Sequence, residues 1–211
     1  MIQPGEDPAD AGSGADQSSV PVDNRLFVLI LQHPQERREP LGTAPALAAT
    51  LHRSRLVTGL SWPNLARALG RPAEPWRWGV LYLGSARPAA SGQDAISVTA
   101  ADGTPLADPA PILRGLDGVV LLDGSWSQAK TLWWRNPWLL KLHRLVLNPA
   151  RPARLGRVRR EPRREALSTI EAAALVLRQL EPSPVSANAL LAALDRLLAT
   201  ARRPPQRRVK A

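Results

Sequence analysis

The stretch GVVLLDGSWSQAKTLWWRNPW, residues 118–138, predicts a buried strand that runs directly into a helix. The run Val119–Leu122 is apolar throughout and has the length of a strand that is buried on both faces. Ser125 and Gln128 have the spacing of a capping box, so a helix is expected directly after Ser125. Asp123 therefore lies at a strand-to-helix turn. In an open α/β sheet such turns are at the carboxyl edge of the strands, where ligands bind.

The rest of the chain repeats this alternation of apolar runs and helical segments. Strands are expected at residues 26–31, 55–58, 79–83, 95–98 and 145–147, and helices at 44–51, 62–69, 169–180 and 187–198, with one or two helical turns within 107–116. Thr43 and Ser61 are expected to cap the first two helices. The alternation predicts an α/β fold, a single domain with a mainly parallel sheet flanked by helices. Neither a GxGxxG turn after the first strand nor a P-loop is present.

The composition divides the chain into three regions. Residues 1–23 are acidic and rich in Pro, Gly, Ser and Ala, which predicts a disordered segment. Residues 24–200 are expected to form the folded domain, and residues 201–211 a flexible basic tail. No apolar stretch approaches the length of a membrane span and no signal peptide is evident, so a cytoplasmic protein without a membrane partner is expected. Nothing in the sequence indicates the oligomeric state.

The charge balance indicates a polyanionic partner. The chain has 28 Lys and Arg against 18 Asp and Glu, a net charge of +10. The segment from Arg151 to Arg164 contains seven arginines and one acid, Glu161, and so carries a local charge of 7 − 1 = +6. Nucleic acid is the simplest partner for such a segment, and a solvated charged loop is the alternative.

Metal sites are not indicated. There are no cysteines, which excludes disulfides and cysteine-ligated zinc. The three histidines, His33, His52 and His143, are scattered among different elements. We therefore expect no metal.

Three polar turns follow apolar strands or begin helices, at residues 32–38, 123–128 and 168–171. Each has an ordinary structural interpretation, because Ser-x-x-Gln and Ser-x-x-Glu are capping boxes and Asp-Gly is a common turn dipeptide. The tryptophans near the second turn, Trp133, Trp134 and Trp138, are interpreted as core and surface cover before any base-stacking role.

The combination of these turns resembles a known family. LDGSWSQAKTLWWRNPWL, followed further along by LSTIEAAALVLRQLE, is similar to the DTW domain, whose name comes from an Asp-x-Thr-Trp motif. Here the motif reads Asp123-Gly124-Ser125-Trp126, with Ser in place of Thr. ILQHPQERREPLGTAPALAATL and GVLYLGSA resemble two further segments of the family. The four segments occur in the family's order and cover roughly residues 25–181.

The resemblance implies both a topology and an activity. DTW proteins are similar to SPOUT-type transferases, whose α/β fold is knotted, and this implies a SPOUT-like and possibly knotted domain. They are tRNA-uridine aminocarboxypropyltransferases, which implies transfer of the 3-amino-3-carboxypropyl group of S-adenosylmethionine to N3 of a uridine in tRNA. The open alternatives are a methyltransferase of the same fold that uses the same donor, and a non-catalytic RNA-binding protein.

The resemblance also suggests roles for individual residues. Asp123 is the expected catalytic base, with binding of the donor's ribose or ammonium group as its alternative role. The expected donor-binding residues are Leu81, Tyr82, Leu83, Gly84, Leu122, Gly124, Ser125, Trp126, Ser168, Thr169 and Glu171. The expected RNA-binding residues are His33, Arg37, Arg38, Arg154, Arg157, Arg159, Arg160, Arg163 and Arg164. The side chain of Trp126 is expected to pack the helix that it begins against the sheet.

The sequence departs from the family's pattern in three places. Many members have an N-terminal cysteine cluster, which this chain lacks. Ser125 stands where the family has Thr, which keeps the hydroxyl group and hence the helix cap. The segment ARPARLGRVRREPRREA also differs from that of many relatives, so substrate contacts can differ where donor binding is kept.

Overall fold

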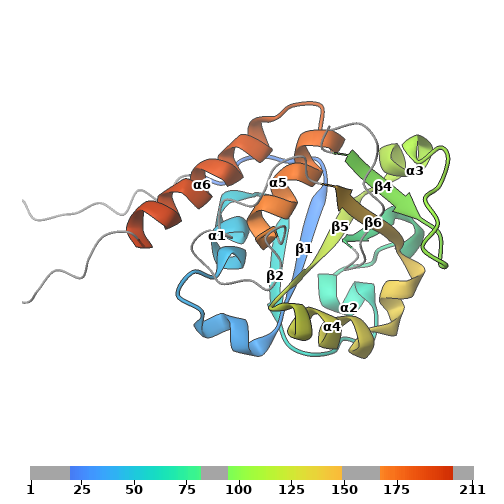
Figure 1. Ribbon diagram of the computed structural model, residues 1–211, viewed down its shortest axis with the longest axis horizontal. Coiled ribbons are helices and arrows are strands. Elements are labelled where there is room, and N and C mark those ends of the chain that lie inside the picture. The colour runs from blue at the N-terminus through green and yellow to red at the C-terminus, as the bar shows by residue number, and fades with distance from the viewer. Residues whose placement is uncertain (1–19, 82–94, 149–166, 202–211) are drawn as a thin grey trace, which may run out of the picture.

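The computed structural model of the protein describes residues 20–81, 95–148 and 167–201. Within these residues the strands form one six-stranded sheet in the order β2-β1-β5-β3-β6-β4 (Figure 1). Neighbouring strands are parallel, except that β4 is antiparallel to β6. The strands are β1 (Phe27–Gln32), β2 (Ser54–Thr58), β3 (Trp78–Leu81), β4 (Ala95–Thr99), β5 (Gly118–Asp123) and β6 (His143–Asn148).

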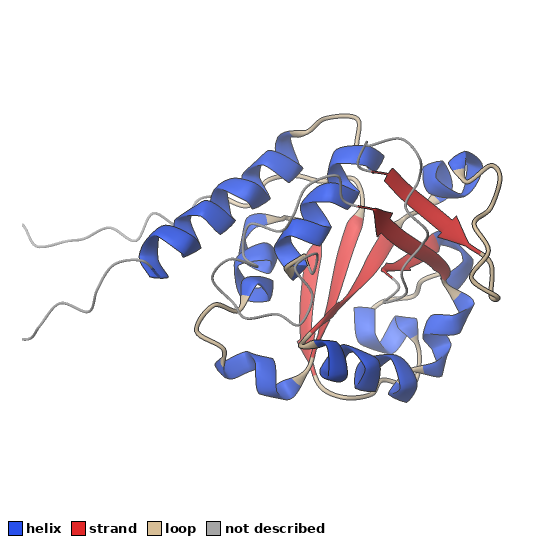
Figure 2. Ribbon diagram, in the orientation of Figure 1, coloured by secondary structure: helices blue, strands red, loops and turns tan. Residues whose placement is uncertain are grey.

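Helices cover both faces of this sheet, as the blue and red elements of Figure 2 show. The α-helices are α1 (Thr43–Thr50), α2 (Leu65–Leu69), α3 (Ala110–Gly115), α4 (Trp126–Arg135), α5 (Thr169–Leu180) and α6 (Val185–Ala201). Three 3₁₀ helices are also described: η1 (Pro34–Arg38), η2 (Pro75–Arg77) and η3 (Pro137–Lys141).

Alternation along the strands divides the core into two apolar clusters. Val28 and Ile30 of β1 pack with α1, α5 and α6 on one face, whereas Leu29 and Leu31 pack with α2 and η3 on the other. All four side chains are fully buried. Strands that are apolar on both faces are typical of parallel sheets covered by helices, so the predicted α/β class with a mainly parallel sheet is confirmed. The SPOUT-like, knotted topology stays a prediction.

The predicted helix caps were correct for the longer helices and wrong for two short segments. Ser168 caps α5, and its side chain accepts a hydrogen bond from the Glu171 N–H group. Thr43 is the first residue of α1 and not its cap, which is Gly42. Ser61 does not cap α2, because the chain turns into that helix only at Asn64. The Ser61 hydroxyl instead donates to the carbonyl of Arg135.

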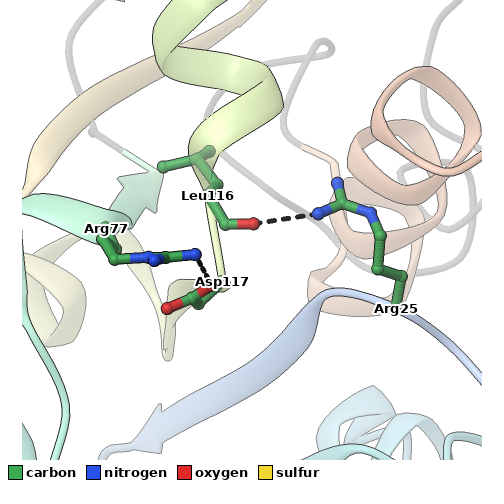
Figure 3. Close-up of polar contacts among 4 residues, drawn as sticks. All are labelled: Arg25, Arg77, Leu116 and Asp117. Atoms are coloured by element: carbon green, nitrogen blue, oxygen red, sulfur yellow. Dashed lines mark hydrogen bonds and ion pairs between the residues drawn. The ribbon is translucent and has the colours of Figure 1, made fainter.

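The amino edge of the sheet is held by polar contacts between the segments that precede the strands. Arg25 donates from Nη1 to the Leu116 carbonyl, at 3.0 Å, and Arg77 forms an ion pair with Asp117, at 2.6 Å (Figure 3). Arg25 also donates to the carbonyl of Leu180 at the end of α5. The ion pair is about half exposed, which limits its worth to about 0–1 kcal/mol. Asp123 lies at the opposite, carboxyl edge.

The described residues contain neither a membrane-spanning helix nor a cluster of metal-binding side chains. No helix among them is long and apolar enough to cross a membrane. No group of three or more acidic or histidine side chains within the same residues is arranged to hold a metal ion.

Candidate functional site

A row of polar side chains crosses three neighbouring strands at the carboxyl edge of the sheet. Thr58, Gln32 and Asp123 are the last residues of β2, β1 and β5, and strand pairing places them side by side. The Thr58 hydroxyl donates to Oε1 of Gln32, at 3.0 Å. Nε2 of Gln32 donates to Oδ2 of Asp123, also at 3.0 Å. Strand register therefore converts three residues that are distant in sequence into one hydrogen-bonded chain.

Helix α5 completes this chain from above the sheet. The hydroxyl of Thr169, the first residue of α5, donates to Oδ1 of Asp123, at 2.5 Å. A carboxylate at this position is also favoured by the partial positive charge at a helix N-terminus. We call Thr58, Gln32, Asp123 and Thr169 the edge network. Its members come from three strands and one helix, so it fixes the N-terminus of α5 relative to the carboxyl edge of the sheet.

Asp123 is almost completely buried, with 5% of its surface exposed, and Gln32 is 2% exposed. Each carboxylate oxygen accepts one hydrogen bond from the network, whereas an ionised carboxylate can accept about four in all. Among the described residues, no Lys or Arg forms an ion pair with Asp123. Buried charges are usually paired, so this carboxylate is suited to a cationic ligand group that reaches the sheet edge.

The turns that follow β1 and β5 are packed against each other beside the edge network. The His33 N–H group donates to the Asp123 carbonyl, at 2.9 Å. A Cβ atom on Gly124 would lie 2.8 Å from Cβ of Gln128 and 3.4 Å from Cβ of His33, so only glycine fits without a shift. The amide of Gln128 then links the two turns, because it accepts from the Ser125 N–H group and donates to Oε1 of Gln35.

The start of α5 is fixed by its own cap. Oε2 of Glu171 accepts from both the N–H group and the hydroxyl of Ser168, at 3.0 and 2.6 Å. The Ile170 N–H group donates to the buried hydroxyl of Thr43 at the start of α1. Capping therefore accounts for Ser168 and Glu171, and it holds Thr169 in the position from which it contacts Asp123.

The structure brings together part of the predicted donor site and leaves part of it outside the described residues. Gly124 and Ser125 follow Asp123 directly, Thr169 donates to its carboxylate, and Ser168 and Glu171 form the cap beside Thr169. Leu81 and Leu122 are half-buried strand residues that pack against the two apolar clusters. The predicted residues Tyr82, Leu83 and Gly84 lie outside the described residues.

The predicted RNA-binding residues divide in a similar way. His33 belongs to the Asp123 turn, where its Nδ1 accepts from the Gln35 N–H group, and Arg37 and Arg38 are exposed on the adjoining helix η1. The arginines at 154, 157, 159, 160, 163 and 164 lie outside the described residues.

The expectation that Trp126 packs α4 against the sheet was wrong. Its side chain is 39% exposed, and Nζ of Lys130 lies 5.5 Å from the centre of its ring. Ala129 and Leu132 are the buried residues of α4, and Trp133 packs partly against the same cluster. Trp126 is the first residue of the helix, and at this exposure it is not the side chain that packs α4 against the sheet.

Sequence reasoning noted Gln32 as a polar strand end and missed Thr58, Thr43 and Gln35. The signal for Thr58 was available, because it is also a polar residue at the end of a strand. Its position beside Gln32 depends on which strands pair and in what register, which one sequence does not specify. Thr43 and Gln35 act only through residues that are distant in the chain.

The sequence of the chain is similar to those of known proteins. The DTW domain model matches residues 16–202. A tRNA-uridine aminocarboxypropyltransferase 2 from Macaca fascicularis is 25% identical over 183 residues, which cover 84% of this chain and 55% of the relative. The chain thus spans about half the length of that curated relative. No solved structure matched the chain significantly.

The family match covers most of the described domain, including all four members of the edge network. The motif Asp123-Gly124-Ser125-Trp126 lies within it, and the structure places that motif at the carboxyl edge of a mainly parallel sheet. The chain belongs to the DTW domain family.

Proposed function

We propose that this protein modifies tRNA by transferring the 3-amino-3-carboxypropyl group of S-adenosylmethionine to N3 of a uridine. The observation that carries the proposal is the edge network, because it joins three segments that resemble the family, those around Gln32, Asp123 and Thr169, at one ligand-binding edge. The name of the relative from Macaca fascicularis and the basic composition of the chain support the same substrate class.

The donor offers groups that match this edge chemically. It carries a cationic sulfonium and an ammonium group, and Asp123 supplies a nearly buried carboxylate with hydrogen-bonding capacity to spare. We assign Asp123 to donor binding in preference to proton removal, because a side chain that is 5% exposed and held by Gln32 and Thr169 is poorly placed to reach a nucleobase. Gly124, Ser125 and Trp126 are proposed to line the same site, with Ser168 and Glu171 acting through the cap that fixes Thr169.

The chemistry demands positioning more than acid catalysis. N3 of uridine forms a bond to the carbon beside the sulfonium, the carbon–sulfur bond breaks, and methylthioadenosine leaves as a neutral sulfide. The N3 proton passes to water or to a basic group during the step. Because the leaving group needs no proton, most of the acceleration is expected from holding the two reacting atoms in line. The rigid contacts among the strand ends and α5 suit that task.

Labelled donor tests this function directly. We expect carbon label from the carboxypropyl group, and none from the methyl group, to enter tRNA when the protein is incubated with unmodified tRNA and S-adenosylmethionine. The reason is that the proposed reaction transfers the four-carbon arm and leaves the methyl group on the sulfide. Transfer of methyl label would instead identify a methyltransferase of the same fold, and transfer of neither label to any tRNA would leave a non-catalytic RNA-binding role.

The arginine-rich segment supplies a second test, on RNA affinity. Replacing Arg157, Arg159 and Arg160 with Ala should weaken tRNA binding and reduce the slope of log K against log salt by about 2–3, because each phosphate contact releases counterions. Donor affinity should stay unchanged. Binding would be measured by filter retention over a range of salt concentrations.

The matched control removes the same charge elsewhere. Arg67, Arg114 and Arg196 are exposed on α2, α3 and α6, and their triple Ala variant should keep the wild-type slope. Equal slopes for the two triple variants would show that general charge, and not this segment, attracts tRNA.

A further inference from the structure

The outer face of α4 carries an exposed row of aromatic and basic side chains. Trp126, Lys130 and Trp134 are spaced four residues apart, which places them on one side of the helix. Trp134 is 78% exposed, the most exposed tryptophan among the described residues, and Trp126 is 39% exposed. Lys130 lies between them with its ammonium group near the Trp126 ring. The row is about 12 Å long, from eight residues at 1.5 Å each.

The packing of α4 within the domain does not account for the aromatic side chains of this row. The helix already packs against the sheet through Ala129 and Leu132, on its other side. Tryptophan is enriched at surfaces that bind a partner, because its ring has an apolar face and a polar N–H group. Trp134, with Lys130 and Trp126 beside it on the same side of α4, is therefore available to such a partner.

The charge around the row selects the kind of partner. In the stretch of described residues 124–148, none is Asp or Glu and four are Lys or Arg: Lys130, Arg135, Lys141 and Arg144. Among these, the guanidinium of Arg144 lies 5.8 Å from the centre of the Trp133 ring, next to Trp134 in sequence. A stretch of one charge sign disfavours a second copy of this basic chain and favours a polyanion.

The row also has a defined relation to the proposed donor site. Trp126 follows Asp123 by three residues and begins α4, so the row starts beside the edge network and runs away from it along the helix (Figure 1). A nucleic acid whose target base reached a donor bound at the edge network would therefore pass its neighbouring nucleotides along this face.

We propose that the outer face of α4 binds unpaired RNA next to the modified nucleotide, with Trp134 stacking on a base and Lys130 contacting the backbone. The inference rests on the proposed function for its choice of RNA. Unpaired bases offer a flat surface to an indole ring, whereas bases in a duplex are already stacked on each other. The row is therefore expected to bind a tRNA loop in preference to a stem. Phosphate contacts by arginines, in contrast, are expected with paired and unpaired RNA alike.

The test compares two exposed tryptophans at opposite ends of the sheet. Trp134→Ala should weaken binding of a fluorescently labelled oligouridylate by roughly tenfold, because one stacked base is lost. Trp134→Phe should restore most of the affinity, since a flat ring remains. The control is Trp76→Ala: Trp76 is 64% exposed, has the guanidinium of Arg77 beside its ring, and lies in η2 at the amino edge. This control should bind RNA as the wild type does.

Further measurements check the specificity of the effect. An RNA duplex of the same length should lose little affinity in Trp134→Ala, and Lys130→Ala should lower the salt slope by about 0.7 for the single strand. The proposal is overturned if Trp134→Ala binds oligouridylate as tightly as Trp76→Ala, or if the wild type does not bind oligouridylate. The proposal would also be overturned if binding of an acidic protein depended on Trp134 while binding of RNA did not.

Failure of this inference can be told apart from failure of the proposed function. Transfer of carboxypropyl label to tRNA by wild type, together with unchanged RNA binding by Trp134→Ala, rejects only the α4 surface. Loss of RNA binding in Trp134→Ala without transfer of either label supports the surface and rejects the reaction.

Discussion

Replacing Asp123 with Asn should leave the protein folded and reduce its affinity for S-adenosylmethionine by about 10–150-fold, the range expected when a hydrogen bond to a charged group is lost. The amide can keep the edge network intact. Its oxygen accepts from Thr169, its nitrogen donates to a flipped Gln32, and the Gln32 nitrogen then donates to the Thr58 hydroxyl, which can accept as well as donate. The substitution therefore removes the negative charge with little loss of hydrogen bonds.

Two measurements separate the possible roles of Asp123. Calorimetric titration gives donor affinity, and a single-turnover rate at saturating donor gives the chemical step. If Asp123 binds the donor, the affinity falls and the rate at saturation changes little. An unchanged affinity with a rate that falls by about 10²–10⁴ would contradict our assignment and identify Asp123 as the base.

Asp123→Ala and Thr169→Val serve as controls for the structural part of the network. The Ala variant leaves the buried Gln32 amide and the Thr169 hydroxyl without their partner, so it should be less stable than the Asn variant by about 2–4 kcal/mol. Thr169→Val keeps the carboxylate and removes one hydrogen bond to it. We expect Thr169→Val to bind donor more tightly than Asp123→Asn, because the charge remains.

The class of fold was predictable from the sequence because the strongest signals were local. Apolar runs such as Val119–Leu122, bounded by turn residues, are typical of strands buried in a parallel sheet, and Ser168 with Glu171 specifies a helix start without help from the rest of the chain. The same locality explains the errors. Ser61 has a suitable position for a cap, but its hydroxyl forms a tertiary bond to Arg135, and Asn64 takes the cap instead.

The site was predictable only as separate turns. Asp123 at a strand end is visible in the sequence, but its partners Gln32 and Thr169 are 91 and 46 residues away, and their contacts depend on strand order and on the path of α5. Trp126 shows the opposite limit. It was expected to pack α4 against the sheet, whereas it is 39% exposed and Ala129 and Leu132 are the buried residues of α4.

Asn136→Ala is expected to be among the most destabilising single substitutions outside the apolar core, with a loss of about 3–5 kcal/mol. Asn136 is completely buried where α4 ends and η3 begins. Its Oδ1 accepts from the N–H groups of the Trp62 backbone and the Trp138 ring, at 2.8 and 3.2 Å. Its Nδ2 donates to the carbonyls of Leu60 and Leu132, at 3.0 and 2.7 Å. The free energy of unfolding would be measured by urea titration.

The loss should be large because truncation leaves several buried groups unsatisfied at once. The Trp138 ring keeps a second acceptor, the Trp62 carbonyl, but the Trp62 N–H group and the two carbonyls lose their side-chain partner. Asn136→Asp tests whether hydrogen bonding or volume is responsible, because it keeps the shape and replaces the donating NH₂ group by an oxygen that faces both carbonyls. We expect it to be at least as destabilising as Ala at neutral pH.

Asn64→Ala is the matched control, since Asn64 is also an asparagine with a side-chain hydrogen bond to the backbone, but it is exposed and caps a single helix. Its expected cost is about 1 kcal/mol. Asn136 joins the segment after β2 to the end of the helix that carries Trp134, so its loss should also weaken oligouridylate binding when the RNA experiment is repeated under folded conditions. If Asn136→Ala lowers the free energy of unfolding no more than Asn64→Ala does, water or a backbone shift must satisfy the Trp62 N–H group and the two carbonyls. Asn136 would then not fix the proposed RNA-binding face of α4.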